Sequence, residues 1–312
     1  MKSASPQESI LVTKKFLLIL LFFFVSCKKT TEEKTLTLQY PNTLASLPLK
    51  MLVVQKHDGF SLKGEAFEDH ALAVASLLRG ELDLLFTGTS LGAMQADKGV
   101  RLFRTLVWGT ASVVLAPKYQ NAKIPTKEPW NFLKGKKISL PFEKSPNDLQ
   151  LKRIEEKAQL KLQREYHPHV QAVSLLLADK LDGAVLPEPL ASQLVLEKKL
   201  PRLGELAQWE EFLVGELAPS PMVSLFVSPT INDYKQRLLK ELEAKIQENI
   251  RMIHEKKEEA LQVAQDNTSP QIAKEALRFT RFAILSKEDE WKKTRAFLEG
   301  AKIKIGDSFF LP

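Results

Sequence analysis

The sequence predicts an α/β protein with two similar lobes, each a mostly parallel sheet flanked by helices, and a helical tail packed on the first lobe. Three observations lead to this expectation. Strand and helix patterns alternate along most of the chain, one stretch is repeated, and the last part contains only amphipathic helix patterns. The 312 residues, 44% hydrophobic and 27% charged, are ordinary for a globular protein of two domains.

The repeated stretch lies in the middle of each expected lobe. Residues 74–91 read VASLLRGELDLLFTGTSL and residues 173–190 read VSLLLADKLDGAVLPEPL, with six of eighteen positions identical without a gap. Both copies have the pattern of a helix end, a polar turn, a Leu-Asp pair, a buried strand and a polar loop. Helix-turn-strand units are common in α/β proteins, so a chance match is the alternative. The strand and helix that precede both copies favour a duplication.

The elements of the first lobe follow from the hydrophobic periodicity. We expect strands at 35–40 and 61–68, a helix at 71–80, a strand at 82–88, a helix at 91–99, and strands at 100–109 and 111–118. Asn42 or Thr43 is expected to cap a helix after the first strand, and His70 to open the next helix. Thr89 or Ser90 is expected to cap the third helix.

The same order of elements then starts again. We expect a strand at 136–143, a helix at 145–160, a strand at 164–170, a helix at 171–179, strands at 182–188 and 222–229, and only helices from 232 to 300. Ser145 as N-cap and Pro146 at the first helical position suit the start of a helix.

Two strands are expected to carry the chain between the lobes, ASVVLAPK outward and MVSLFVSP back. The expected division therefore assigns residues 36–112 and 223–312 to the first lobe and 113–222 to the second. Two passages between lobes make a hinge.

The N-terminal segment predicts export. Lys14 and Lys15 precede an apolar stretch at residues 16–25, which has the length of a signal-peptide core and is too short to cross a bilayer. Ser26 and Cys27 close this stretch, and the polar run KKTTEEKT follows. The arrangement resembles a bacterial lipoprotein signal at residues 1–27, with acylation of Cys27 and a tether at 28–35. The protein would then be anchored to a membrane in the periplasm or at the cell surface. An ordinary cleaved signal or a buried free cysteine are the alternatives.

Composition excludes several classes of protein. Cys27 is the only cysteine, which excludes disulfide scaffolds and zinc ribbons. The formal net charge is +7, but Lys alternates with Glu in the expected helices, and no basic stripe carries aromatic residues. We therefore expect no nucleic-acid partner. HExxH and P-loop motifs are absent from the sequence.

Three segments carry a resemblance to a known family, namely LRGELDLLFTGTSLGAM, LKGKKISLPFEKSPNDLQLKRIEEKAQL and DGAVLPEPLASQL. They are similar to the solute-binding proteins of bacterial importers of the nitrate, sulfonate, taurine and thiamine-pyrimidine type, and the resemblance extends over about residues 36–310. It implies a type II periplasmic-binding-protein fold whose lobes close on a small solute, and delivery to an ABC permease with its ATPase. It also implies a monomer without a cofactor.

Two other functions are weighed against solute binding. One is a surface lipoprotein that keeps the fold for sensing or adhesion. The other is an enzyme of the thiamine-pyrimidine synthesis type, but those enzymes carry a cysteine-rich motif that this chain lacks. We therefore expect no enzyme activity. The resemblance has one departure, because PNTLASLPLKMLVVQK replaces a longer glycine-bearing loop.

The candidate ligand-binding residues lie where loops and helix starts follow the strands, since ligands bind at the carboxyl ends of strands in α/β sheets. They are Asn42, Thr43, His70, Thr87, Gly88, Thr89, Ser90 and Trp108 from the first lobe, and Ser145, Asn147, Asp148, His167 and Glu188 from the second. Lys144 is the only cation in these loops, and Trp108 offers a stacking face. The set favours a nitrogen- or sulfur-containing solute, heteroaromatic or amine-bearing.

Glu188 has two possible roles. Pro187 ends its strand and Pro189 suits the first turn of the next helix, so the carboxylate has a fixed direction. It either accepts a hydrogen bond from the ligand or stabilises the helix start and the hinge. His167 and His169 flank a proline and could share one strand face, but typical zinc spacing is absent, and we expect no metal site.

Overall fold

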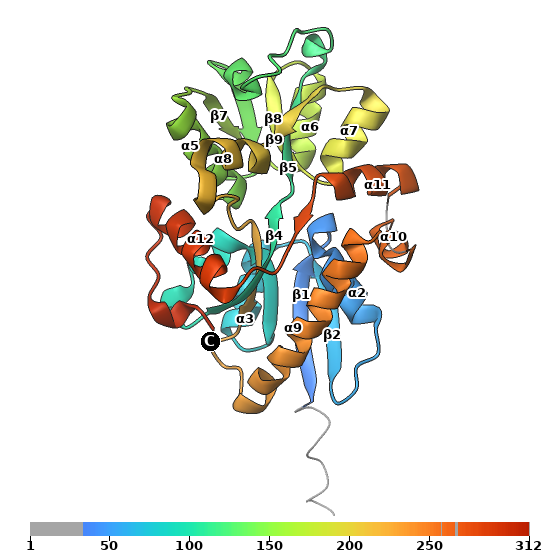
Figure 1. Cartoon of the computed structure of the whole chain (residues 1–312), viewed down its shortest axis with the longest axis vertical. Coiled ribbons are helices and arrows are strands. Elements are labelled where there is room, and N and C mark those ends of the chain that lie inside the picture. Colours follow the sequence, from blue (N-terminus) through green and yellow to red (C-terminus); the bar gives the residue numbers. More distant parts are fainter. Residues whose placement is uncertain (1–33, 257, 266–267, 312) are drawn as a thin grey trace, which may run out of the picture.

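The computed structural model describes residues 34–256, 258–265 and 268–311, which form two lobes, each with its own sheet (Figure 1). Cys27 and the expected signal peptide lie outside the described residues. No helix in the described part of the chain is both long enough and apolar enough to span a bilayer.

The sheet of the first lobe has six strands in the order β11-β4-β10-β3-β1-β2. Their bounds are Thr35–Pro41 for β1, Ser61–Phe67 for β2, Leu84–Gly88 for β3, Arg101–Gly109 for β4, Val223–Val227 for β10 and Arg281–Phe282 for β11. β1 is parallel to β2 and β3, whereas β10 is antiparallel to β3 and β4.

The sheet of the second lobe has five strands in the order β7-β6-β8-β5-β9. Their bounds are Ala111–Leu115 for β5, Lys137–Leu140 for β6, Gln163–Tyr166 for β7, Gly183–Pro187 for β8 and Arg202–Glu205 for β9. β6 is parallel to β7 and β8, and β5 is antiparallel to β8 and β9. Both sheets are thus mixed, because the first strand after each passage between the lobes, β5 or β10, runs antiparallel to its two neighbours.

The two passages between the sheets are short. Thr110 alone separates β4 from β5, so the outward passage falls slightly before the expected division after residue 112. The return passage leads from a 3₁₀ turn at Gly215–Leu217 to β10. Each of the two strands expected to cross therefore lies within one sheet.

Helices cover both faces of each sheet (Figure 1). In the first lobe these are α2 (Leu47–Val54), α3 (His70–Leu78), α4 (Thr89–Ala93), α9 (Asp233–His254), α10 (Glu258–Ala264) and α12 (Lys287–Gly300). In the second lobe they are α5 (Pro146–Ala158), α6 (His169–Leu177), α7 (Leu190–Lys198) and α8 (Leu206–Val214).

The C-terminal part differs from the expected series of helices in two ways. Arg281 and Phe282 form the edge strand β11 beside β4, where Phe282 is buried in the core of the first lobe. Helix α11 (Pro270–Arg278) lies against α7 of the second lobe, whereas α9 and α10 pack on α2 of the first. The tail therefore contacts both lobes.

Predicted helix starts are confirmed at Ser145 and His70 and differ at two other positions. Ser145 Oγ accepts from the Asp148 amide at the start of α5, as predicted. Asp69, one residue before His70, caps α3. Thr43 precedes a 3₁₀ turn without a side-chain cap, and the helix expected at 91–99 starts earlier, at Thr89, with Gly88 as N-cap.

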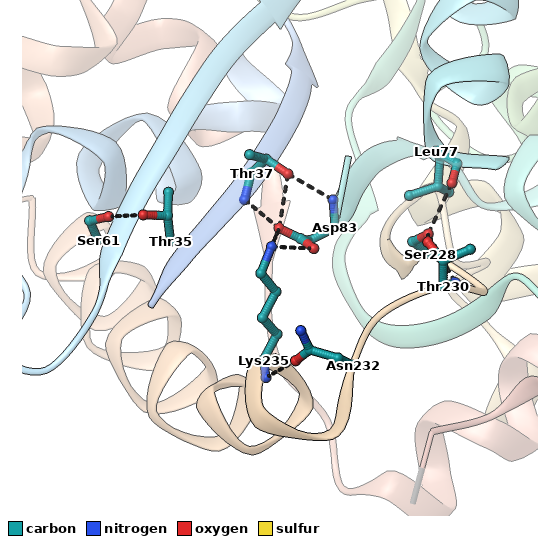
Figure 2. Close-up of polar contacts among 9 residues, drawn as sticks. All are labelled: Thr35, Thr37, Ser61, Leu77, Asp83, Ser228, Thr230, Asn232 and Lys235. Carbon is teal, nitrogen blue, oxygen red and sulfur yellow. Dashed lines mark hydrogen bonds and ion pairs between the residues drawn. The ribbon is translucent and has the colours of Figure 1, made fainter. Parts of the chain in front are cut away.

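A buried ionic cluster fastens α9 to the first sheet. The Asp83 carboxylate accepts from the Thr37 amide at 2.8 Å, from the Thr37 hydroxyl at 2.9 Å, and from Lys235 Nζ at 2.8 Å (Figure 2). These contacts join β1, the turn before β3 and the first turn of α9. The C-terminal helices are thereby anchored to the lobe that contains both ends of the described chain.

Candidate functional site

A cavity of about 140 Å³ lies between the two lobes, next to the ends of β3, β4 and β8. The first lobe contributes Pro41, Thr43, Ala45, His70, Gly88, Leu91, Met222 and Val223 to its wall. The second lobe contributes Pro141, Phe142, Ser145, Pro146, Asn147, His169, Pro187 and Glu188, and Thr110 lies at the passage between them. The wall is therefore mainly apolar, with a few polar groups from both lobes, as is typical of small-molecule sites.

Two histidines occupy equivalent places on opposite sides of the cavity. His70 is the first residue of α3, and His169 is the first residue of α6. Burial lowers the pKa of both, although nearby Asp69 opposes this effect at His70. Both imidazoles are thus neutral at pH 7 and can each donate and accept one hydrogen bond.

The two rings differ in their protein partners. His70 Nδ1 lies 3.1 Å from Thr87 Oγ1, and Phe67 packs edge-on against the His70 ring. Within the described residues, neither ring nitrogen of His169 has a hydrogen-bond partner. His169 is therefore the more available of the two for a ligand.

Six of the predicted residues line this cavity, namely Thr43, His70, Gly88, Ser145, Asn147 and Glu188. Three other predicted residues lie behind the cavity wall. Thr87 positions His70, and Thr89 Oγ1 bonds to Ser224 Oγ at 2.6 Å inside the first lobe. Ser90 Oγ donates to the Lys144 carbonyl at 2.9 Å, which is a direct contact between the lobes. Asn42 lies in a neighbouring groove, where its amide oxygen accepts from Lys50.

The remaining three predicted residues do not line the cavity either. Trp108 is 2% exposed, and its indole N–H donates to the Ala283 carbonyl, so the ring belongs to the first lobe's interior. The Asp148 carboxylate is buried and accepts from the Lys144 amide, Lys152 and Tyr166. His167 lies in the loop between β7 and α6, and its Nδ1 lies 3.1 Å from Ser139 Oγ of β6.

Glu188 lines the cavity, but both of its carboxylate oxygens have protein partners. Oε1 accepts from Arg202 at 2.5 Å, and Oε2 accepts from the Ser192 amide in α7. Arg202 also bonds to the hydroxyls of Ser112 and Ser192, and its guanidinium lies 3.6 Å from the centre of the Phe279 ring. Glu188 therefore holds β8, β9 and α7 together where α11 reaches the second lobe.

Several residues of the wall were not predicted from the sequence. His169 could have been predicted from the repeat. When the two copies are extended by four residues toward the N-terminus from residues 74 and 173, His169 aligns with His70. Thr110, Phe142 and Met222 could not have been predicted in this way, since they come together only through the packing of the two lobes.

The described residues contain no group of three or more His, Cys, Asp or Glu side chains that could hold a metal ion.

No protein-family model matches the sequence, and no curated protein matches it. Solved structures do match. An ABC transporter protein from Parabacteroides distasonis is 15% identical, with a TM-score of 0.70 over 89% of this chain and 99% of that one. The zinc-bound ligand-binding component of an ABC-type import system from Staphylococcus aureus is 13% identical, with a TM-score of 0.67 over 89% and 97%.

The periplasmic aliphatic sulphonate binding protein from Escherichia coli is 15% identical, with a TM-score of 0.66 over 88% of this chain and 96% of that one. At such low identity the likeness concerns the fold and not the ligand. The chain has the two-lobed type II fold of the periplasmic solute-binding proteins of ABC importers.

Proposed function

We propose that the chain is the extracytoplasmic solute-binding lipoprotein of an ABC importer, which captures a small nitrogen- or sulfur-containing solute and delivers it to a membrane permease. The cavity between the lobes carries this proposal, because both lobes and the passage at Thr110 contribute to its wall. A solute in this place contacts both lobes only when they are closed.

The mechanism is a shift in the population of open and closed forms. Rotation about the passage at Thr110 and the return passage before β10 separates the lobes, and it breaks the contact between Ser90 and Lys144. The solute binds the closed form more tightly and therefore raises its population. The permease then distinguishes the loaded protein by its closed shape, and no covalent chemistry is needed.

The test uses the full-length protein purified from its own cells. The protein is denatured, the small molecule that it releases is identified by mass spectrometry, and this molecule is added back to refolded protein. We expect a higher melting temperature, since the ligand binds the native state only, and a smaller radius of gyration in X-ray scattering. Release of no molecule, together with no thermal shift from a panel of nitrogen and sulfur compounds, would count against solute capture and favour a sensing or adhesion role.

The membrane anchor is tested separately. Cys27 is proposed to carry the acyl chains, so Cys27→Ala should move the protein from the detergent-rich phase to the aqueous phase in Triton X-114 partition. Cys27→Ala protein that remains in the detergent-rich phase would contradict lipidation at this residue.

A further inference from the structure

Two residues of the cavity wall, Thr110 and Asn147, each carry a buried polar atom without a partner. Thr110 Oγ1 and Asn147 Oδ1 are buried and make no hydrogen bond to any part of the chain that the structure describes. Thr110 is 8% exposed, and its carbonyl accepts from the Glu188 amide, so its backbone is fixed between the sheets. Buried polar groups are paired in nearly all native proteins, and among the unpaired atoms of the described residues only these two belong to residues of the cavity wall, where a ligand can complete them.

The wall offers no counter-charge to an ionic solute. It contains neither Lys nor Arg, and the Glu188 carboxylate is already neutralised by Arg202. Helix starts could bind an anion in place of a cation. However, the protein's own carboxylates already lie at three of them, with Asp69 at α3, Asp148 at α5 and Glu188 at α7.

The cavity has room for about one ring. A cavity of about 150 Å³ holds a benzene molecule, and the cavity here has about 140 Å³. Phe142, Leu91 and Met222 supply apolar contact surface around such a ring.

We infer that the solute is uncharged, has about the size of one six-membered ring, and donates a hydrogen bond to Asn147 Oδ1 while also bonding to Thr110 Oγ1. This inference rests on the proposed function and names the chemistry of its solute. His70 and His169 fit the same chemistry, because neutral imidazoles accept hydrogen bonds from N–H or O–H groups. The expectation differs from the sulphonate named for the Escherichia coli structure.

Calorimetry on the full-length protein with probes of matched size tests the charge. Benzamide and uracil are the uncharged probes, benzenesulfonate is the anion, and benzylammonium is the cation. We expect an uncharged probe to bind at least tenfold more tightly than either ion. Tighter binding of benzenesulfonate, or no binding of either uncharged probe at millimolar concentration, overturns the inference. Tighter binding of benzenesulfonate would leave the proposed function intact. The released-solute experiment tests that function independently.

Two substitutions test the contact atoms. Thr110→Val and Asn147→Leu each remove one unpartnered oxygen, and each should weaken binding of the best uncharged probe about tenfold, the effect of one lost hydrogen bond. Thr294→Val is the matched control, because Thr294 Oγ1 is also buried and unpartnered but lies in α12, outside the wall. Thr110→Val should leave the melting temperature of the empty protein unchanged or raised. If Thr110→Val weakens binding no more than Thr294→Val does, the assignment of Thr110 is wrong.

Discussion

Asp83 and Asp182 hold the same position in the two lobes. Each precedes a central strand, β3 or β8, and each accepts a backbone N–H at 2.8 Å from the neighbouring strand, at Thr37 or Lys137. Their own amides donate to the carbonyls of these same residues. Each carboxylate also pairs with a lysine at 2.8 Å, Lys235 for Asp83 and Lys118 for Asp182. The repeat seen in the sequence thus extends to individual hydrogen bonds.

Asp182 should make the second lobe sensitive to acid. Burial raises its pKa, but hydrogen bonds from Lys118, the Lys137 amide and Tyr119 outweigh burial and lower the pKa to about 2. A carboxyl with a lowered folded-state pKa stabilises the fold above its unfolded pKa of about 3.9, and this contribution is lost as the pH falls toward 2. We expect Asp182→Asn to cost about 2 kcal/mol at pH 6. Urea unfolding should show that this difference shrinks between pH 4 and pH 2, and a difference that does not change with pH would contradict the assignment.

Glu188→Gln should lower the stability of the empty protein. The substitution keeps the shape of the side chain but leaves the Arg202 guanidinium without its carboxylate in a buried place. Loss of one partner of a buried pair costs about 3 kcal/mol or more, which urea unfolding can measure. Glu248→Gln is the control, since Glu248 pairs with Arg251 on the exposed face of α9 and should cost less than about 1 kcal/mol. A Glu188→Gln protein of unchanged stability that binds solute weakly would instead make Glu188 a ligand group.

The order of elements could be predicted from the sequence because it depends on local patterns. The repeat and the Ser145-Pro146 helix start are readable without the fold, and the structure has α5 beginning at Pro146. β11 could not be predicted, because a strand of two residues has no periodicity and forms only where Arg281 and Phe282 meet β4. The contact of α11 with α7 is likewise a property of tertiary packing.

The cavity was harder to predict than the fold for a similar reason. β4 is buried along nearly its whole length, so alternation along the strand does not indicate which face meets the other lobe. The prediction that Trp108 stacks on a ligand failed on this point, since its indole N–H binds the Ala283 carbonyl. His70 was predictable because it opens a helix after a strand, and the repeat carried the same information for His169.

Gly88→Ala should hinder closure of the lobes without disturbing either lobe alone. An added Cβ would lie 3.0 Å from Pro146 Cγ, which belongs to the opposite lobe, and a small opening of the cleft relieves this contact. Overpacking costs about 1 kcal/mol or more, so we expect solute affinity to fall at least about fivefold, with a larger radius of gyration in X-ray scattering. Gly300→Ala is the control, because its Cβ would have no neighbour within 4 Å at the end of α12. Equal affinities for the two variants would mean that the lobes do not close on the solute at this contact.

His70 and His169 should make the empty protein less stable as the pH falls below their ordinary range. Burial lowers the pKa of each in the folded state, so the unfolded chain takes up protons first. A lowered folded-state pKa means that stability is complete above about pH 6.5 and is lost as the pH falls through the lowered values. Each histidine can contribute at most about 1.4 kcal/mol per pH unit, the effect of one proton. Urea unfolding at pH 7.5 and pH 5 should therefore show a smaller loss for the double variant His70→Gln, His169→Gln than for the unaltered protein. His254→Gln, at an exposed site in the last turn of α9, is the control and should lose as much stability between pH 7.5 and pH 5 as the unaltered protein. A double variant with the same loss as the unaltered protein would show that the two imidazoles are solvated.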